Sequence, residues 1–273
     1  PLAQRGDPAS GRARREARGR RCADSPTRRA LPPPLGPRSS LAVDRVAMSS
    51  IMQYNGSAVI AMAGKNCVAI ASDRRYGIRN QTMGCEMQKT FKMNDRTWVG
   101  LTGLATDVQT LAQKFNFRVN MYRLREDRDI SPSAFSNMVS SLLYEKRFGP
   151  YFCEPVIAGL GEGDKPYLCG MDLLGAQVFT DNFILAGDCT EAMYGLCESM
   201  YKPDLEPDDL FETLAQCLLS GVDRDCLAGW GCVVHVITPE GTTTRQIKAV
   251  VGDVWVDLEQ YSRDRLEVAI SPI

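Results

Sequence analysis

The sequence predicts an α+β fold in which two β-sheets are each covered by a pair of helices. Short segments rich in Val, Ile and small residues come in pairs joined by turn residues, as in hairpins. Apolar residues recur at helical spacing in two separate pairs of segments. The order along the chain is therefore strands, two helices, strands, two helices, strands. Because each sheet needs one face covered, we expect each helix pair to pack on one sheet.

Two hairpins are predicted in the first half of the chain. In each, two short apolar segments flank residues that favour turns. The predicted strands are 57–62 and 67–72 around the turn 63–66, and 89–93 and 98–103 around the turn 94–96.

A pair of helices follows the second hairpin. The first helix is predicted from apolar residues at every third or fourth position, and the second from Ser131 as N-cap with Pro132 at the first helical position. Gly149 and Pro150 are expected to end the second helix. The two apolar stripes are Leu104, Val108, Leu111, Phe115, Val119 and Tyr122, and Phe135, Met138, Val139, Leu142 and Leu143.

The second half of the chain repeats this order. Its predicted strands are 154–160, 166–172, 177–180 and 183–186, its helices are centred on 193–200 and 210–222, and its last strands are 232–238 and 242–248. Gly159, Gly161 and Gly163 lie between two strands, without a following helix to receive a phosphate, so we reject a phosphate-binding loop there. Residues 251–273 are either a short amphipathic helix or disordered.

Charge is distributed unevenly along the 273 residues. Residues 1–47 contain eleven Arg, no Lys, four acidic residues and seven Pro, without apolar periodicity, and we expect them to be a disordered leader. The remainder has 21 basic and 29 acidic residues, which does not favour nucleic acid as a partner. The sequence has neither an apolar run long enough to span a bilayer nor a signal-peptide core, so we expect a soluble, intracellular protein.

The ten cysteines do not indicate a metal site or a disulfide framework. They are scattered singly through apolar segments, there is no CxxC pair, and only one His is present to share a zinc ion. We therefore expect reduced, mostly buried thiols, and neither a cofactor nor a bound metal.

The chemistry of the chain is concentrated around its first hairpin. Ser57 stands where the first strand begins, Asp73 where the second ends, and Lys89 sixteen residues later, so a hydroxyl, a carboxylate and an ammonium can converge. An N-terminal hydroxy residue can use its own α-amine as the base that activates it. The hairpin, its exit ASDRR, Lys89 and the later GLTGLATD resemble the proteasome β-subunits of the N-terminal nucleophile hydrolase superfamily, with the closest fit to the β3-type branch.

The resemblance extends over roughly residues 48–248, and we take 48–250 as the β-subunit domain and 251–273 as a C-terminal extension. It implies a four-layer αββα sandwich with the two sheets face to face. Aligned without gaps from the hairpin, it places the nucleophile position on Ser57, the carboxylate on Asp73, the lysine on Lys89 and the oxyanion-hole glycine on Gly103. A second carboxylate position falls on Asp225.

Two positions depart from the family pattern. The family has serines at two positions, where they hydrogen-bond around the terminal amine and the catalytic water. This chain has Asp188 and Ala228 there, and an alanine side chain can neither donate nor accept a hydrogen bond. While Ser57 remains joined to Gly56, its nitrogen is an amide and cannot act as a base. β3-type subunits keep a short uncleaved N-terminus, and residues 48–56 are of that short kind.

These implications favour a non-catalytic subunit of the 20S proteasome core, which degrades ubiquitinated proteins through its sibling subunits. Its partners would be other α- and β-type subunits and, indirectly, the regulatory particle. We expect it in the cytoplasm and the nucleus, and we expect it to bind neither nucleic acid nor a membrane. The alternative is an active serine-type hydrolase that uses Ser57 after cleavage of the Gly56–Ser57 bond. A free-standing binding module is a third hypothesis.

Three further residues or pairs receive an interpretation. The resemblance places Asp172 against the substrate channel of an adjoining active subunit, whereas an Asp at a strand end is equally typical of a simple turn. His235 alternates with apolar residues, which favours a packed strand residue over a catalytic one. Arg74 and Arg75 are expected to form a local ion pair with Asp73.

Overall fold

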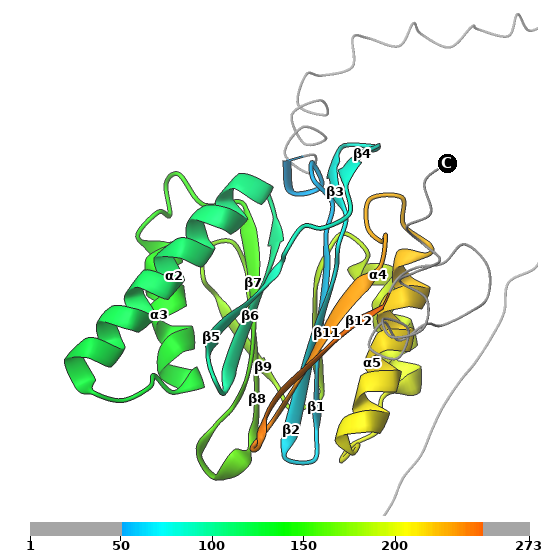
Figure 1. Cartoon of the computed structure of the whole chain (residues 1–273). Helices are drawn as coiled ribbons and strands as arrows, with labels where there is room; N and C mark the ends of the chain where they lie inside the picture. The colour runs from blue at the N-terminus through cyan, green and yellow to red at the C-terminus, as the bar shows by residue number, and fades with distance from the viewer. Residues whose placement is uncertain (1–50, 248–273) are drawn as a thin grey trace, which may run out of the picture. The chain divides into compact units, whose positions relative to one another are not determined.

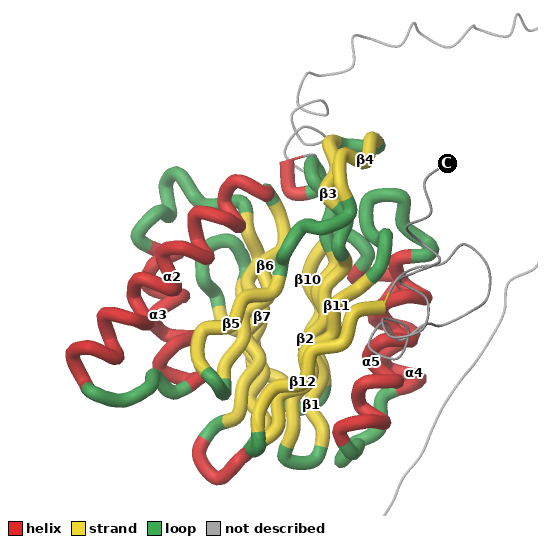
Figure 2. The backbone as a smooth tube through the Cα atoms, in the orientation of Figure 1, coloured by secondary structure: helices red, strands yellow, loops and turns green. Residues whose placement is uncertain are grey.

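The computed structural model describes residues 51–247, so the expectations for residues 1–47 and 251–273 lie outside the described part of the chain. Four layers of secondary structure follow one another in it (Figure 1). Two five-stranded antiparallel sheets lie in the middle, with α2 and α3 against one and α4 and α5 against the other (Figure 2). This arrangement confirms the expected αββα sandwich.

The first sheet has the strand order β10-β1-β2-β11-β12, and the second has the order β5-β6-β7-β8-β9. The first consists of β1 (Ala58–Gly64), β2 (Cys67–Asp73), β10 (Phe183–Gly187), β11 (Cys232–Thr238) and β12 (Gly241–Ile247). The second consists of β5 (Thr90–Asn94), β6 (Thr97–Gly103), β7 (Cys153–Leu160), β8 (Pro166–Met171) and β9 (Gln177–Thr180). The helices are α2 (Ala105–Glu126), α3 (Pro132–Tyr144), α4 (Thr190–Met200) and α5 (Pro207–Val222).

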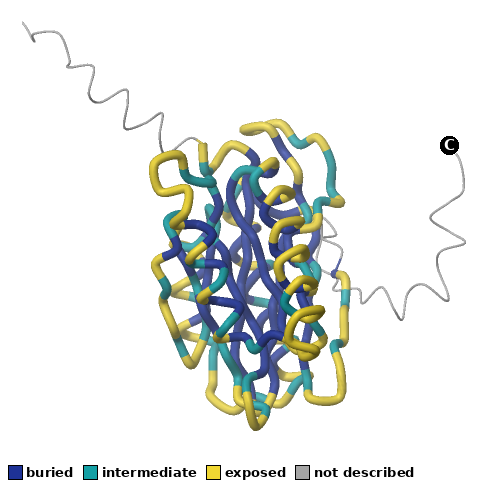
Figure 3. Tube along the Cα trace, turned by 90° about the vertical axis from the view of Figure 1, so that its left-hand side faces the viewer, coloured by how far each residue is buried: buried dark blue, intermediate teal, exposed yellow. Residues whose placement is uncertain are grey.

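Apolar side chains fill the three spaces between these four layers. β1 and β2 are buried along their whole length, because alternate residues face α4 and α5 on one side and the other sheet on the opposite side. Ile60 and Met62 thus belong to the helix-facing cluster, whereas Val59 and Ala61 belong to the cluster between the sheets. Figure 3 shows the buried residues gathered in the middle of the molecule, with exposed residues at its ends and on its outer surface.

Most element boundaries agree with the prediction to within one or two residues. Ser131 caps α3 as expected, since its hydroxyl accepts a hydrogen bond from the Ala134 amide at 3.3 Å. The α3 helix, however, ends at Tyr144, before Gly149, because the amides of residues 146, 147 and 149 donate to the carbonyl three residues back, as in a 3₁₀ turn, and not to the fourth. The glycine-rich link between β7 and β8 contains only a single 3₁₀ turn, η1 (Glu162–Asp164).

One hairpin was missed by the sequence analysis. Strands β3 (Tyr76–Ile78) and β4 (Gln81–Gly84) form a separate two-stranded sheet immediately after β2. They are only three and four residues long, and most of their residues are exposed or half-buried. Such short segments offer too few positions for a strand periodicity to be recognised.

Two expectations are confirmed: His235 is a packed strand residue, and the cysteines are mostly buried. His235 is buried on β11, its ring stacks on Trp98 at 3.9 Å between centroids, and its two nitrogens hydrogen-bond to the hydroxyls of Thr90 and Thr244. The nine cysteines among the described residues are unpaired, and seven of them are buried. Between residues 51 and 247, no helix combines the length and the apolar character that crossing a bilayer requires.

Candidate functional site

Ser57 lies just before β1 and is fixed from three sides. Its hydroxyl accepts a hydrogen bond from the Gly103 amide at 3.1 Å, its backbone nitrogen donates to the Asp188 carboxylate at 2.9 Å, and its carbonyl accepts from the Asp188 amide at 2.9 Å. Only 3% of the residue is exposed. The strand ends of β6 and β10 therefore hold the predicted nucleophile position in a single orientation.

The predicted carboxylate and ammonium also meet here. Asp73 at the end of β2 and Lys89 before β5 form an ion pair at 2.6 Å, and both side chains are essentially inaccessible to solvent. The Asp73 carboxylate also accepts hydrogen bonds from three backbone amides, those of Ala58, Arg75 and Gly229. Four donors thus compensate its burial, as a charge removed from water requires.

Lys89 is directed at the residue before Ser57. Its ammonium donates to the Gly56 carbonyl oxygen at 3.1 Å as well as to Asp73. In the described part of the chain, the only hydrogen bond of the Ser57 hydroxyl is the one that it accepts from Gly103. The hydroxyl therefore has no bonded base that could take its proton.

Gly103 occupies a backbone conformation that other residues avoid. Its φ is +111°, and a Cβ at this position would lie 2.2 Å from the Phe152 carbonyl oxygen. This conformation ends β6 and directs the Gly103 amide at Ser57. Such an amide can stabilise a developing oxyanion, which is the role that the resemblance implies for this glycine.

The opposite side of Ser57 has an excess of negative charge. Burial raises the pKa of the Asp188 carboxyl to about 6, the hydrogen bond from the Ser57 amide opposes this shift, and the charge of Asp225 adds to it. One Asp225 oxygen accepts from the Leu227 amide at 3.0 Å, while the other is buried without a hydrogen-bond partner among residues 51–247. Ala228 adjoins this region as a buried methyl group and provides neither donor nor acceptor.

A cavity of about 390 Å³ opens beside Ser57. Its wall carries the acidic side chains Glu154, Asp188 and Glu191. Burial raises the pKa of Glu154, a hydrogen bond from the Gly187 backbone opposes this, and the charge of Asp172 adds to it. No group of three or more His, Cys, Asp or Glu residues suited to a metal ion occurs within the described ranges.

The expected ion pair of Arg74 and Arg75 with Asp73 is wrong. The buried Arg75 side chain instead binds the carbonyl oxygens of Asn55, Arg79 and Leu227. Its Nε donates to the Thr82 hydroxyl, and Arg74 donates to Gln246. The carboxylate is already paired with Lys89, so the guanidinium serves as a connector between backbone segments.

Asp172 is exposed at the turn after β8. One of its carboxylate oxygens accepts the amides of Leu174 at 2.9 Å and Ala176 at 2.7 Å, which accounts for a turn-forming role. Asp172 does not line the cavity beside Ser57, although its charge acts on Glu154, which does. Its expected contribution to a neighbouring subunit stays a prediction.

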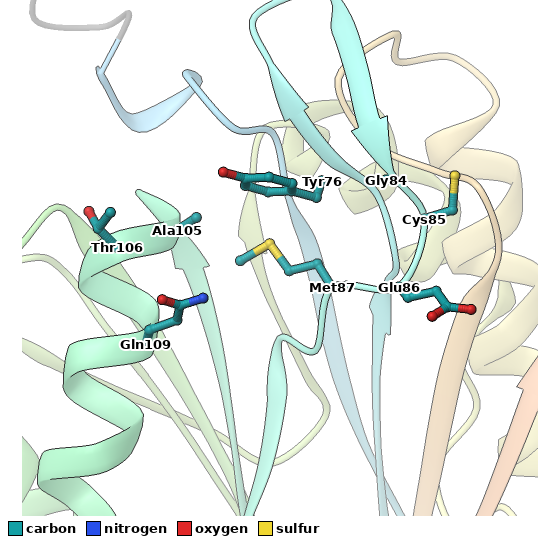
Figure 4. Close-up of a pocket in the computed structure, with 8 residues that line it drawn as sticks. All are labelled: Tyr76, Gly84, Cys85, Glu86, Met87, Ala105, Thr106 and Gln109. Atoms are coloured by element: carbon teal, nitrogen blue, oxygen red, sulfur yellow. The ribbon is translucent and has the colours of Figure 1, made fainter.

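Two features escaped the sequence analysis. Asn55, two residues before Ser57, is buried and hydrogen-bonded through its side chain to Gly77 and Ala105. A second cavity, of about 550 Å³, lies between the β3–β4 hairpin and the start of α2, where Tyr76, Met87 and Gln109 point toward a common space (Figure 4). A single Asn before a strand has no periodic signal, so only the folded chain identifies it.

Comparison with known proteins gives consistent results. Residues 53–237 match the family described as "Proteasome subunit". The chain is similar to proteasome subunit beta type-3 of Picea mariana, with 59% identity over 199 residues that cover 73% of this chain and 98% of the relative. It is 56% identical to the probable proteasome subunit beta type-3 of Schizosaccharomyces pombe and 50% identical to proteasome subunit beta type-3 of Drosophila melanogaster, with the same two coverages in each case.

Proposed function

The chain belongs to the proteasome subunit family, and we propose that it serves as a non-catalytic, structural β-subunit of the β3 type in the 20S core particle. In this role it completes a protein-degrading complex in which sibling subunits cleave ubiquitinated substrates. The high identity to relatives named beta type-3 supports the subunit type. The geometry around Ser57 supports the absence of catalysis.

The observation that carries this proposal is the use of Lys89. A hydroxyl nucleophile needs a neighbouring base, which can be its own free α-amine when it is the N-terminal residue. The Lys89 ammonium donates to Asp73 and to the Gly56 carbonyl, and as long as the Gly56–Ser57 bond is intact the Ser57 nitrogen is an amide, which here donates to Asp188. The groups around Ser57 thus bind the preceding residue and do not activate the hydroxyl.

An electrophilic inhibitor that modifies N-terminal hydroxyl nucleophiles tests the proposal. Assembled particles would be treated with the inhibitor until the catalytic siblings are fully modified, and the mass of each subunit would then be measured. We expect the siblings to gain the adduct and this chain to remain unmodified. An adduct on Ser57 would support the alternative, an active serine-type hydrolase formed after cleavage of the Gly56–Ser57 bond.

Exposed apolar side chains support assembly with other proteasome subunits. Such residues lie on several elements of the described chain, including α2, β9 and the loop before β11, and large exposed apolar areas are typical of interaction surfaces. The most exposed are Phe117, Leu124, Tyr144, Phe148, Val178, Phe179 and Trp230. We expect the chain to co-purify with α- and β-type subunits in a large particle, whereas a stable monomer at micromolar concentration would favour a free-standing binding module.

Asp172 is proposed to influence a neighbouring active subunit. Its second carboxylate oxygen has no hydrogen bond to the turn and is free to attract a substrate Lys or Arg in a partly water-excluded channel. Asp172→Asn keeps an oxygen acceptor for the turn and removes the charge. We expect slower cleavage after basic residues and unchanged cleavage after acidic residues in assembled particles.

The matched control is Asp181→Asn, which removes an exposed carboxylate from the turn between β9 and β10. This substitution should leave both activities unchanged. An equal loss of both activities in Asp172→Asn would mean that the substitution had damaged assembly, and the proposed channel role would then be rejected.

The location of the protein is also a proposal. Membership of the proteasome subunit family supports the cytoplasm and the nucleus as its compartments. Fluorescent tagging of the chain, followed by imaging together with a tagged α-type subunit, tests this. Signal confined to any other compartment would contradict it.

A further inference from the structure

The segment before Ser57 is built into the fold through its backbone. The Tyr54 carbonyl accepts from the Arg79 amide at 2.7 Å, and the Asn55 carbonyl accepts from the Arg75 guanidinium at 3.2 Å. The Gly56 carbonyl accepts from Lys89. Each of the three consecutive carbonyl groups in residues 54–56 thus has a partner on the β3–β4 side or in the interior.

The Asn55 side chain makes a bridge that no other described residue makes. Its amide nitrogen donates to the Gly77 carbonyl on β3 at 2.9 Å, and its oxygen accepts from the Ala105 amide, the first of α2, at 2.9 Å. Only 4% of the residue is exposed. One carboxamide therefore joins the small hairpin to the start of the longest described helix.

The α2 helix depends on this bridge because it lacks a cap of its own. Leu104 occupies the N-cap position and its side chain makes no capping hydrogen bond. The first amides of a helix have no partner within the helix, and an uncompensated amide in the interior is costly. Asn55 supplies the missing acceptor from fifty positions earlier in the sequence.

Gly56 shows how closely this segment is enclosed. Its φ is +72°, and a Cβ would lie 1.9 Å from the Leu227 carbonyl oxygen and 2.9 Å from the Arg75 guanidinium. The same guanidinium donates to the Leu227 and Arg79 carbonyls. Arg75 thereby connects the segment, the β3–β4 hairpin and the loop before β11.

We infer that residues 54–56 form a permanent internal strap that locks the β3–β4 hairpin against the start of α2, with Asn55 as the positioning residue. The buried Asp73–Lys89 pair anchors the end of the strap through Gly56. The strap also fixes the distance between Tyr76 and α2 across the cavity of Figure 4. The inference rests on the proposed function in one respect, that the Gly56–Ser57 bond stays intact.

Hydrogen exchange in assembled particles tests the strap. The chain would carry Asn55→Ala, Asn55→Asp or the control Gln53→Ala, which truncates a neighbouring exposed side chain without a hydrogen bond among the described residues. Exchange would be followed by mass spectrometry in peptides from residues 76–84, from the start of α2 and from β11. In Asn55→Ala we expect roughly tenfold faster exchange at Ala105 and in the hairpin, with β11 unchanged.

Asn55→Asp separates the two halves of the bridge. It keeps an acceptor for the Ala105 amide, where a negative charge is also favoured by the helix dipole, but it removes the donor for Gly77. We expect protection at Ala105 to persist while the hairpin exchanges faster. Equal acceleration everywhere, including β11, would indicate general destabilisation and overturn the inference, as would wild-type exchange in Asn55→Ala.

The intact mass of this chain, measured in the same samples, separates failure of the proposed function from failure of the strap inference. A chain that begins at Ser57 would reject both the proposed function and the strap. A chain that keeps residues 54–56 but shows no change of exchange in either Asn55 variant would reject the strap alone. If neither Asn55 variant enters particles while Gln53→Ala does, Asn55 is required by the whole fold, and the inference of a strap that acts locally on the hairpin and α2 is overturned.

Discussion

The two sides of Ser57 differ in how completely their charges are compensated. On one side, the Asp73 carboxylate is matched by the Lys89 ammonium and by three backbone amides. On the other side, Asp188 and Asp225 are two carboxylates with only a few backbone donors between them, and one Asp225 oxygen has no partner among the described residues. The first side resembles a completed structural network, whereas the second is electrostatically strained.

This difference indicates which residues the fold depends on. The residues at the family's Asp and Lys positions also hold the strap and the ends of β1 and β2, so their loss would damage the structure even without catalysis. The departures from the family pattern, Asp188 and Ala228, lie on the other side, where the residues connect fewer elements. A subunit of this family can therefore keep much of the active-site pattern for structural reasons alone.

The largest effect is expected for Lys89→Met. Removing the ammonium leaves Asp73 buried without its counter-charge, and breaking a buried pair in this way typically costs about 3–5 kcal/mol. Denaturant-dependent hydrogen exchange of the β1 and β2 amides in assembled particles would measure the loss. The control Lys92→Met removes a lysine of the same sequence region whose ion pair with Asp95 is exposed, and it should change little. Equal effects would abolish the contrast between the two sides.

His235 is a buried ionisable residue outside the surroundings of Ser57, and both nitrogens of its neutral ring are hydrogen-bonded. It therefore serves as a comparison for the charged groups on the two sides of Ser57. Burial lowers its pKa to about 4 in the folded protein, from an ordinary value of 6.5. The unfolded chain therefore binds the proton more readily between these values, and the folded state loses about 3 kcal/mol as the pH falls from 6.5 to 4.

His235→Phe retains the stacking on Trp98 and removes the titration. We expect the variant to be less stable than wild type at pH 7, because two threonine hydroxyls lose a partner, but to have a flatter pH dependence between 6.5 and 4. The same exchange measurement at several pH values would show this. An unchanged slope would mean that His235 is not the titrating group.

A smaller effect of opposite sign is expected for Asp188→Ser. The Asp188 pKa is raised from 3.8 to about 6, so the folded state is penalised by this group as the pH rises through that range. Serine retains an acceptor for the Ser57 amide without the charge. Allowing for the partial exposure of Asp188, we expect a gain of about 1–2 kcal/mol at pH 7.5 that disappears near pH 4. A loss of stability at pH 7.5 would show that the Asp188 charge is structurally required.

The smallest effect is expected for Ala228→Ser. The substitution restores a hydroxyl that the family pattern contains, but it provides neither a free α-amine nor a base for Ser57. We expect a stability change below about 1 kcal/mol and no modification of Ser57 by an electrophilic inhibitor. Modification of Ser57 by the inhibitor in Ala228→Ser would contradict this, because it would show that the missing hydroxyl alone prevents catalysis.

Much of the fold could be predicted from the sequence, because its helices and strands carry clear periodicities. The start of α3 follows from Ser131 and Pro132, and the burial of β1 and β2 follows from their apolar composition. The β3–β4 hairpin could not be predicted, because its strands are short and depend on Arg75 and Asn55 for their position.

The candidate site was predictable only in part for a similar reason. The pairing of Asp73 with Lys89 next to the Gly56–Ser57 peptide follows from their places at strand ends of neighbouring hairpins. The partners of Arg75 and of Asp73 could not be anticipated, because Leu227 and Gly229 come from a loop about 150 positions away in sequence. Local spacing therefore suggested an ion pair that the distant contacts replace.

The most direct test of the account is the identity of the residue that precedes Ser57 in the working particle. Assembled particles would be digested with a protease that does not cleave next to glycine or serine, and the peptide containing Ser57 would be sequenced by mass spectrometry. We predict a peptide in which Asn55 and Gly56 remain joined to Ser57, in full yield. A mature chain that begins at Ser57 with a free amine would contradict the account.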